Sequence, residues 1–448
     1  MKNCLLFVCV LFSTTLIAQE FFSGIGTSKR VGILNGNFNP AEFANLSSKM
    51  ELQFFATSIN FSNNKIGFGD FAGDADLQDL IFIGDEPVNV RIDTEIAGPG
   101  FAFRQGKWGF AVTSKAYGKL NLVDIDVNIG DAIANNGINS ILNSTTLNGN
   151  FNQRIIGTTY GEMGFSVARS LWETAKYKLN AGATFKLLFP GSYANFGMDQ
   201  FQGTITRVGG NSVLTNSNAT LNIAYSGSLG NNFSNFDSYS DSVFGDINGF
   251  GADLGITFSI KDEKGGFKFN SGISVRNIGA MTFNDADNLS TNYTLSIQGT
   301  ESLNLSQFEN VESLQEIEQI LLDSGFVTAI SQNNDFRVKL PTVLNAYADL
   351  QLIPNLNLSL FLQQKITDDA NNDQVTAQNV ITFTPRLSLK HFEIYTPLSQ
   401  TEIAGFNAGV GFRFYGFFIG SNSAMTALLN DSKQADFYLG YRLGLGKI

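Results

Sequence analysis

The stretch "KYKLNAGATFKLLFP", residues 176–190, alternates between two kinds of side chain without a slip. One alternate set is apolar and comprises Tyr177, Leu179, Ala181, Ala183, Phe185, Leu187 and Phe189. The other set is polar or small and comprises Lys176, Lys178, Asn180, Gly182, Thr184 and Lys186. A period of two is typical of a β-strand with one apolar face. A strand in an ordinary sheet needs only about 5–6 residues, so the length of this one requires a further cause.

The same alternation recurs along the chain, in segments 248–261, 267–276, 336–352 and 375–390. The even-numbered residues form the apolar face of 336–352. The apolar face of 375–390 carries Val375, Ala377, Ile381, Phe383, Leu387 and Leu389. These long segments indicate an all-β protein in which many strands share one two-sided design.

Three architectures are compatible with many β-strands. A β-sandwich favours shorter strands with more evenly spaced turns, and a solenoid requires a fixed repeat length, which the sequence lacks. A transmembrane antiparallel β-barrel turns its apolar face to lipid and its other face to a polar interior. A tilted strand needs about 9–11 residues to cross the bilayer. We therefore predict a barrel, in which membrane thickness determines strand length.

The pattern predicts about fourteen strands. They lie near 50–62, 90–104, 107–121, 153–171, 176–192, 247–261, 266–283, 335–352, 355–368, 374–390, 391–398, 403–414, 416–422 and 434–446. Residues 200–208 and 217–226 form a possible further hairpin, inside or above the membrane. An even number of strands closes the sheet and leaves no unpaired edge in lipid.

The connections between these strands alternate in length. Short turns are expected at 105–106, 172–175, 262–265, 353–354, near His391 and near Tyr415. The other connections are mostly long: 63–89, 122–152, 193–246, 284–334, 369–373, 399–402 and 423–433. Short turns on the periplasmic rim and long loops on the outer rim are typical of outer-membrane barrels.

The N-terminus predicts export from the cytoplasm. A short basic start precedes an apolar run from Cys4 to Ile17, and Ala18 is a small residue suited to cleavage. This pattern predicts that residues 1–18 are a secretory signal peptide. Both cysteines of the chain lie within it, so we expect no disulfide and no cysteine-bound metal in the exported protein. No later segment has about 18 consecutive apolar residues, as a transmembrane helix would.

Composition excludes some partners. Charged residues make up 15% of the chain, against roughly 25% in a soluble domain. Lysine and arginine total 29 against 40 acidic residues. Nucleic-acid binding is therefore not expected, because phosphate contacts need clustered basic side chains.

The two ends of the predicted strands carry recognisable signals. Trp108 and Trp172 lie beside short turns, where barrels place an aromatic girdle at the membrane surface. In the last strand, "DFYLGYRLGLGKI", the residues Tyr438, Gly440, Leu443 and Leu445 resemble the C-terminal signal read by the barrel-assembly machinery. The terminal Lys447-Ile448 departs from the commonest form of that signal, which ends in an aromatic residue.

Residues 19–49 precede the first strand and are neither periodic nor strongly apolar. They contain Asn39-Pro40-Ala41. With this element and its overall layout, the chain resembles uncharacterised bacteroidete outer-membrane barrels grouped with the FadL/PorV-like fourteen-stranded proteins. That resemblance implies that 19–49 folds into the lumen as a hatch and that 50–448 forms the barrel. A plain tether is the alternative, since Asn-Pro also initiates ordinary turns.

The resemblance implies two different roles. Likeness to FadL implies passive uptake of a small hydrophobic molecule that leaves by a lateral or hatch-side opening. Likeness to PorV implies a scaffold that hands secreted proteins to the cell surface.

Two outer loops contain helical patterns. Residues 306–323 carry an apolar stripe, with Ser306 and Glu309 as a capping box and Gly325 as the stop. This helix would either cover the barrel mouth or pack on its own loop. A second helix is expected around 131–142.

Two acidic clusters contain carboxylates of the kind that calcium binds. They are Asp74, Asp76 and Asp79, and Asp368, Asp369 and Asp373. Neither has the glycine and distal glutamate of an EF-hand loop. We interpret both as solvated loop charge and expect no metal and no cofactor.

Catalysis is not expected. The one histidine, His391, falls at a predicted periplasmic turn. A membrane phospholipase would need a Ser–His pair near the outer leaflet, on the opposite rim. No glycine-rich phosphate loop joins a strand to a helix.

The sequence thus predicts a cell outer membrane barrel in contact with membrane lipid, with no enzymatic activity. The leading function is passive transport of a small hydrophobic solute, and the alternative is a scaffold that transports nothing. An apolar route through the lumen would favour transport, and a lumen packed with polar side chains would favour the scaffold. Eight basic residues are expected to face the lumen: Lys176, Lys178, Lys186, Lys268, Arg276, Arg337, Lys339 and Arg386.

Overall fold

The computed structural model describes residues 21–70, 80–134, 144–231, 244–262, 266–284, 288–429 and 432–447. The predicted signal peptide, the cluster at Asp74 and most of the predicted helix at 131–142 lie outside these ranges.

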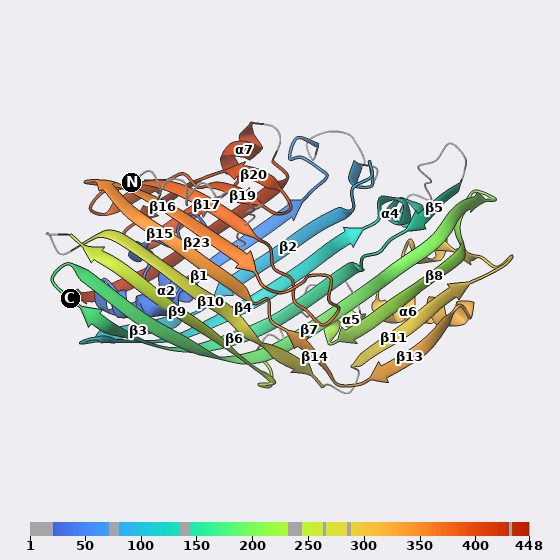
Figure 1. Cartoon of the computed structure of the whole chain (residues 1–448), viewed down its shortest axis with the longest axis horizontal. Helices are drawn as coiled ribbons and strands as arrows, with labels where there is room; N and C mark the ends of the chain where they lie inside the picture. Colours follow the sequence, from blue (N-terminus) through green and yellow to red (C-terminus); the bar gives the residue numbers. More distant parts are fainter. Residues whose placement is uncertain are drawn as a thin grey trace, which may run out of the picture.

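The described chain forms a closed antiparallel barrel with a ring of 14 strands (Figure 1). In ring order these are β1 (Ser48–Asn63), β2 (Val88–Ala97) with β3 (Gly100–Gln105), β4 (Trp108–Ile125), β6 (Gln153–Glu173), β7 (Tyr177–Val208), β9 (Gly249–Lys261), β10 (Phe267–Phe283), β14 (Phe336–Lys339) with β15 (Val343–Ile353), β16 (Leu356–Lys365), β17 (Val380–Ser388), β18 (Phe392–Tyr395) with β19 (Leu398–Thr401), β20 (Gly405–Ala408) with β21 (Val410–Phe414), β22 (Phe417–Ser421) and β23 (Gln434–Lys447). Pairing of β1 with β23, from Ser48–Lys447 to Ser62–Gln434, closes the ring. Each predicted strand has a counterpart in this ring.

Side chains alternate across the barrel wall as the opening stretch requires. Phe185 is 50% exposed on the outer surface, whereas its neighbour Lys186 is buried in the lumen. Further exposed apolar residues form a belt around the ring, among them Ile92, Phe165, Leu254, Ile256, Ile273, Leu360, Phe383 and Leu443. Such a belt is the lipid-facing surface of an outer-membrane barrel. Among the described residues, no helix is long and apolar enough to cross a membrane.

A second, smaller body extends the barrel beyond the ring, at the right of Figure 1. The first part of β7 pairs with β9, from Tyr177 to Leu187, and its second part pairs with β8 (Asn211–Ser226). The predicted hairpin at 200–208 and 217–226 is therefore present. Its strands join the other elements of this outer body: β5 (Ser144–Asn148), β11 (Leu289–Ile297), β12 (Leu303–Asn304), β13 (Val327–Asn333), α4 (Val127–Ala134), α5 (Ser228–Asn231), η5 (Leu305–Phe308) and α6 (Leu314–Ser324).

The outer body has its own apolar core, in which α6 packs on β8 and β11. Two tyrosines, Tyr225 and Tyr293, donate hydrogen bonds to the buried carboxylate of Glu318 on α6. Burial and this carboxylate raise the pKa of Tyr293 to about 12. The helix therefore packs on β11 of its own loop and on β8 of the 193–246 connection.

The predicted helix over 306–323 is wrong in its first half. A short η5 ends at Phe308, and α6 begins only at Leu314, where Ser313 accepts a hydrogen bond from the backbone N–H of Glu316. Ser313-x-x-Glu316 has the same Ser-x-x-Glu spacing as Ser306 and Glu309, but it stands directly before α6. The expected stop at Gly325 is confirmed, because Gly325 caps α6 with a positive φ of 74°.

The predicted face of 336–352 is wrong over its first five residues. Val338 and Leu340 are buried inside the barrel, whereas Arg337 and Lys339 are exposed. From Val343 onward the predicted alternation holds, with Asn345 and Tyr347 buried. Pro341 lies in the break between β14 and β15. A proline cannot donate a ladder hydrogen bond. At this break the buried residues change from even-numbered to odd-numbered positions.

The predicted strand over 374–390 starts six residues too early. Residues 374–378 are buried, and Val375 and Ala377 are packed inside the lumen rather than against lipid. The ring strand β17 begins at Val380. The strand predicted at 391–398 extends to Thr401 as β18 and β19.

The belt gives the first prediction. Leu254→Arg, in the middle of β9, should lower the free energy of unfolding by about 2–4 kcal/mol, because it puts a charge in the hydrocarbon layer. Leu428→Arg is the matched control, since Leu428 is 84% exposed on α7 (Ala424–Leu428) in the loop between β22 and β23. Denaturant unfolding in lipid vesicles measures both. Equal stability of the two variants would show that the apolar face of β9 does not touch lipid.

Candidate functional site

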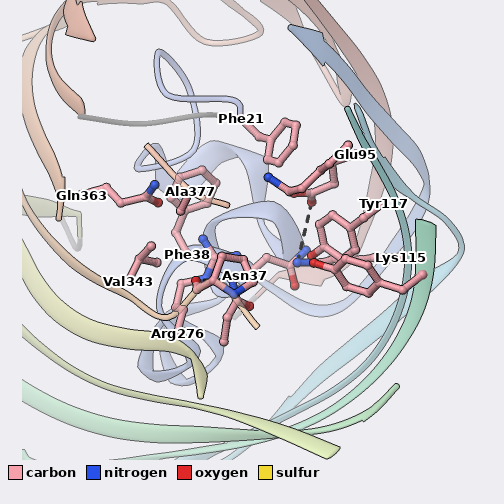
Figure 2. Close-up of a pocket in the computed structure, with 14 residues that line it drawn as sticks. Phe21, Asn37, Phe38, Glu95, Lys115, Tyr117, Arg276, Val343, Gln363 and Ala377 are labelled. Atoms are coloured by element: carbon pink, nitrogen blue, oxygen red, sulfur yellow. Dashed lines mark hydrogen bonds and ion pairs between the residues drawn. The ribbon is translucent and has the colours of Figure 1, made fainter. Parts of the chain in front are cut away.

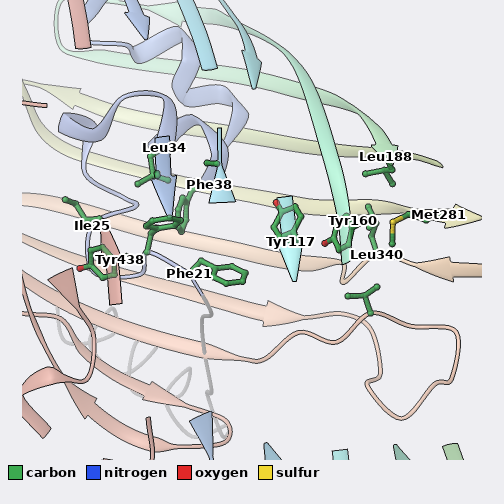
Figure 3. Packing of buried hydrophobic residues seen from close by; sticks show 14 of the residues in the cluster. Phe21, Ile25, Leu34, Phe38, Tyr117, Tyr160, Leu188, Met281, Leu340 and Tyr438 are labelled. Carbon is green, nitrogen blue, oxygen red and sulfur yellow. The ribbon is translucent and has the colours of Figure 1, made fainter. Parts of the chain in front are cut away.

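The N-terminal residues 21–46, named the hatch here, lie inside the barrel (Figure 3). The hatch contains η1 (Lys29–Val31), α2 (Ile33–Phe38) and η2 (Pro40–Asn45). Asn39 ends α2 and caps η2, because its Oδ1 accepts a hydrogen bond from the N–H of Ala41 at 3.0 Å. Pro40 takes the first position of η2, where its missing N–H costs nothing. The Asn-Pro-Ala element is therefore a helix junction.

The same element docks on glycines of the barrel wall. Asn39 Nδ2 donates to the carbonyl oxygens of Ile256 and Ile273, at 3.0 and 3.2 Å. A Cβ at Gly255 would lie 2.1 Å from Asn39 Oδ1, and one at Gly182 would lie 2.5 Å from the backbone of Ala41. A side chain at either glycine would therefore push the hatch off the wall.

The buried carboxylate of Glu42 also holds η2 in place. Glu42 Oε1 accepts hydrogen bonds from Asn270 Nδ2 at 2.6 Å and from the hydroxyl of Tyr347, and its Oε2 accepts one from Asn45 at 2.9 Å. In addition, Lys178 Nζ donates to the carbonyl of Ala44 at 2.9 Å. Hydrogen bonds to charged groups are about twice as strong as neutral ones, so these contacts hold the hatch firmly in this position.

A loop from the opposite end also enters the barrel. Residues 366–379, named the inner loop here, connect β16 to β17. Asp369 pairs with Arg91 at 2.5 Å and with Lys365 at 2.9 Å. Burial would raise the pKa of Asp369, but these two cations outweigh it and hold that pKa below its usual value.

Further contacts secure the rest of the inner loop. Tyr193 donates from its hydroxyl to the carbonyl of Asn372 at 2.6 Å, and Asn121 donates to Thr376 Oγ1 at 2.7 Å. Asp373 pairs with Lys339 at 2.8 Å, on an exposed surface. Two of the three aspartates in the predicted loop cluster, Asp369 and Asp373, thus pair with different basic residues. Among the described residues, no group of three or more histidine, cysteine or acidic residues is placed to hold a metal ion.

Ion pairs line the wall between the two plugs. Lys186 lies 3.2 Å from Glu162 and 2.9 Å from Asp253. Four of the eight predicted inward cations are buried: Lys178, Lys186, Arg276 and Arg386. The other four are exposed: Lys176, Lys268, Arg337 and Lys339. Lys268 is exposed at the point where the β9–β10 ladder shifts register, between Phe267 and Phe269.

An apolar column runs through the lumen beside these charges. Figure 3 shows Leu188, Met281 and Leu340 at one end and Leu34 and Ile25 of the hatch at the other. Aromatic rings connect the two ends: Tyr160, Tyr117, Phe21 and Phe38. Tyr117 stacks on Tyr160 with ring centroids 4.7 Å apart, and Phe21 lies 6.5 Å from Tyr117. An apolar column is unexpected in a lumen, which is polar in most such barrels.

A small cavity interrupts this column where the two plugs meet (Figure 2). It is lined by Phe21 and Phe38 of the hatch, Tyr117 of the wall and Ala377 of the inner loop, with Arg276 on another side. Its volume is about 30 Å³, enough for roughly one water molecule. Residues of the hatch, the wall and the inner loop therefore leave little free space at this point of the lumen.

The other sequence-predicted residues are placed as follows. Tyr438 and Gly440 face the lumen, where Tyr438 donates to the Tyr395 hydroxyl at 3.3 Å, while Leu443 and Leu445 face lipid. The residues of the predicted assembly signal are thus divided between two faces of β23, and their role in assembly stays a prediction. His391 stacks on Tyr415 with centroids 4.4 Å apart, at the predicted short turn.

The aromatic girdle is also present. Trp108 and Trp172 are both exposed at the short-turn end. Trp172 stacks on Tyr177, and Arg169 lies over the ring of Trp108 at 4.9 Å.

Several functional residues have no sequence signal. The inner-loop anchors Arg91, Arg154 and Tyr193 lie far from the loop in sequence, and only the closed barrel brings them to it. The run 374–378 carries no signal for the inner loop either, because its alternation of Val375 and Ala377 with polar residues also fits a ring strand.

Together, the closed ring, the lipid belt and the lumenal plug define an outer-membrane β-barrel with an N-terminal hatch. A family model described as "Family of unknown function (DUF5723)" matches residues 40–422. The chain belongs to this family.

Solved structures to which the chain is similar include the following three. A TodX mutant, described as a monoaromatic hydrocarbon channel, is 11% identical over 91% of this chain and 93% of its own, with a TM-score of 0.43. The toluene transporter TodX of Pseudomonas putida is 11% identical over 96% and 98%, with a TM-score of 0.41. A FadL homologue of Pseudomonas aeruginosa is 9% identical over 96% and 99%, with a TM-score of 0.43. Because these TM-scores are below 0.5, the function of this chain has to be inferred from its own residues. No curated protein matches the chain.

The glycine contacts give the second prediction. Gly255→Val should displace the hatch, because the new side chain would occupy the position of Asn39. We expect the variant to conduct ions in planar bilayers, where the parent protein is closed. Gly118→Val is the control, since a Cβ at Gly118 has no atom within 4 Å. A closed Gly255→Val barrel would mean that the hatch does not seal the lumen.

The inner loop gives the third prediction. Asp369→Ala removes the carboxylate that faces Arg91 and Lys365, and breaking such a buried pair costs about 3–5 kcal/mol of stability. We also expect faster proteolysis between residues 366 and 379. The control is Asp368→Ala, in which the exposed neighbour loses one hydrogen bond, from the N–H of Ala370, worth about 1 kcal/mol. If both variants lose equal stability, the ion pairs do not anchor the loop.

Proposed function

We propose that this barrel passively transports a small hydrophobic solute across the outer membrane. The solute would travel along the apolar column, and the hatch and the inner loop would act as two gates. The observation that supports this proposal is the column itself, in which residues of both plugs and of the wall pack together.

The chemistry of the column supports an apolar and preferably aromatic solute. Rings contribute much of its surface, from Phe21 and Phe38 through Tyr117 and Tyr160 to Tyr193 and Phe283. Aromatic rings prefer offset or edge-on contacts with one another. A planar ring that entered could therefore replace one ring contact with another at little cost in free energy.

The flanking ion pairs are compatible with this route. The Lys186 group is paired with two carboxylates, so its charge is compensated locally and need not be met by the solute. An apolar stripe with a small number of polar groups beside it is the usual composition of a ligand site.

The first gate would be the N-terminal part of the hatch. Phe21 contributes a ring to the cavity and lies ahead of η1 in the chain. Its contact with Tyr117 is a single tilted ring pair. By contrast, η2 is held by Asn39 and Glu42. Rotation of the Phe21 ring alone would thus open the column, while Phe22 keeps its contacts with Phe418 and Tyr438 and η2 stays in place.

A non-transporting scaffold is the second candidate function. The observation that favours it is the closed lumen, with a cavity of only about 30 Å³ between the plugs. In that case the apolar column would be a core that stabilises a permanent plug, and function would lie on the outer body or the rim.

A tether across the first gate distinguishes these two functions and is the fourth prediction. The double variant Phe21→Cys/Tyr117→Cys places two thiols across the gate, and both native cysteines lie in the predicted signal peptide. A reducible bis-methanethiosulfonate reagent would join the two thiols. Uptake of labelled toluene by intact cells should fall to background after cross-linking and return after reduction.

Each single-cysteine variant, treated in the same way, controls for loss of the ring and for labelling. Labelled sucrose controls for leakage through a damaged barrel. Toluene uptake that is unchanged by the tether would reject the proposed gate. Uptake no faster than in cells without the protein would reject transport of this solute and favour the scaffold.

A further inference from the structure

A second cavity lies at the short-turn end of the barrel, outside the apolar column. Its volume is about 380 Å³, within the range of small-molecule sites. Lys29 of the hatch lines one side, and Arg386 of β17 lines another. The rim includes Asp262 of the β9–β10 turn and Asn355 of the β15–β16 turn. The cavity is therefore bounded partly by the hatch and partly by the wall.

Lys29 places a buried ammonium group at this cavity. Its Nζ is buried without a hydrogen-bond acceptor among the described residues. The ring of Phe267 lies against this group, with its centroid 3.1 Å from Nζ. A ring covers one side of an ammonium group and leaves its other N–H groups unmatched. Buried polar groups without partners are rare in folded proteins.

Arg386 presents further unmatched donors. Its Nη2 binds Asp349 at 2.5 Å, but Nε and Nη1 are buried with no acceptor in the described chain. Amide side chains of Gln351 and Asn357 complete a polar lining nearby.

The carboxylates around the cavity have partners of their own. Asp349 accepts from Arg386 and from Ser359 Oγ at 3.3 Å. Glu393 accepts from Ser388 Oγ at 2.6 Å and from Ser28 Oγ at 3.4 Å, and it pairs with Arg30 at 3.5 Å. The surplus in the cavity consequently lies in N–H donors rather than in acceptors, despite the nearby acidic groups.

We propose that this cavity binds a small organic anion, with a carboxylate or phosphate group held between Lys29 of the hatch and Arg386 of the wall. Both groups are strong acceptors that match ammonium and guanidinium donors. The remaining volume would take the body of the ligand, with the amides of Gln351 and Asn357 as further contacts.

Such an anion would also couple the hatch to the barrel wall. Lys29 belongs to the hatch, whereas Arg386 belongs to a ring strand, so one bound group would bridge the two. Burial lowers the pKa of Lys29 to about 8, against the attraction of Glu42 and Asp349. A bound anion would favour the charged amine and raise that pKa.

Calorimetric titration of the purified, detergent-solubilised protein tests this site. The probes are inorganic phosphate, succinate and the uncharged succinamide, at constant ionic strength in sodium chloride. We expect saturable binding of phosphate or succinate and none of succinamide. Lys29→Met should weaken that binding at least tenfold, and Arg386→Lys should weaken it while it keeps a charge for Asp349.

Lys49→Met is the matched control, because Lys49 is an exposed lysine near the start of β1 at the same end of the barrel. Heat-modifiable mobility on gels verifies that each variant is a folded barrel. The proposal fails if neither anion binds saturably, or if Lys29→Met binds as tightly as the parent protein. Binding is measured without transport, so a negative uptake experiment would leave this result unaffected.

Discussion

Closure of the sheet is the constraint on which the rest of this structure depends. In hydrocarbon, a backbone N–H or C=O without a partner costs several kcal/mol, so a sheet can cross the membrane only when its two edges meet. The ladder between β1 and β23 provides that meeting over most of the length of both strands. Once the ring is closed, the environment of each set of alternate residues is fixed. One set meets lipid, and the other set is enclosed with whatever fills the lumen.

The lumen of a fourteen-stranded ring is the second physical problem. Side chains alone can fill an eight-stranded barrel, and about sixteen to eighteen strands leave a water channel. Here the chain fills the intermediate space from both ends, with the hatch from one side and the inner loop from the other. Backbone brought into a lumen needs partners for its own polar groups. The wall provides them through Lys178, Ser274 and Arg154, whose side chains donate to carbonyl oxygens of the hatch or the inner loop.

Wall glycines explain how the hatch can lie so close. Gly182, Gly255 and Gly272 lie on three neighbouring strands, and a Cβ at each would collide with Asn39 or with the adjoining Pro40 and Ala41. The absence of side chains there lets Asn39 reach the wall carbonyls directly. The glycines and the Asn-Pro-Ala element are thus two halves of one contact.

The amino-acid pattern by itself determined the barrel, because a period of two sustained over membrane length is compatible with few folds besides a membrane barrel. Each ring strand could be located, and so could the outward apolar face of segments such as 176–190. Errors arose where a short alternating run is compatible with two environments. Phe336, Val338 and Leu340 form an apolar face against the lumenal column, not lipid, and Val375 and Ala377 of the inner loop pack inside the lumen.

Periodicity records that one face is apolar, but not which apolar surroundings that face meets. Only the tertiary structure decided this, because the lumenal column is built from segments far apart in the chain. The same holds for the ion pairs of Lys186 and Asp369, and for the cavity beside Lys29. Each depends on the register at which distant strands close around the two plugs, and no local run of residues encodes that register.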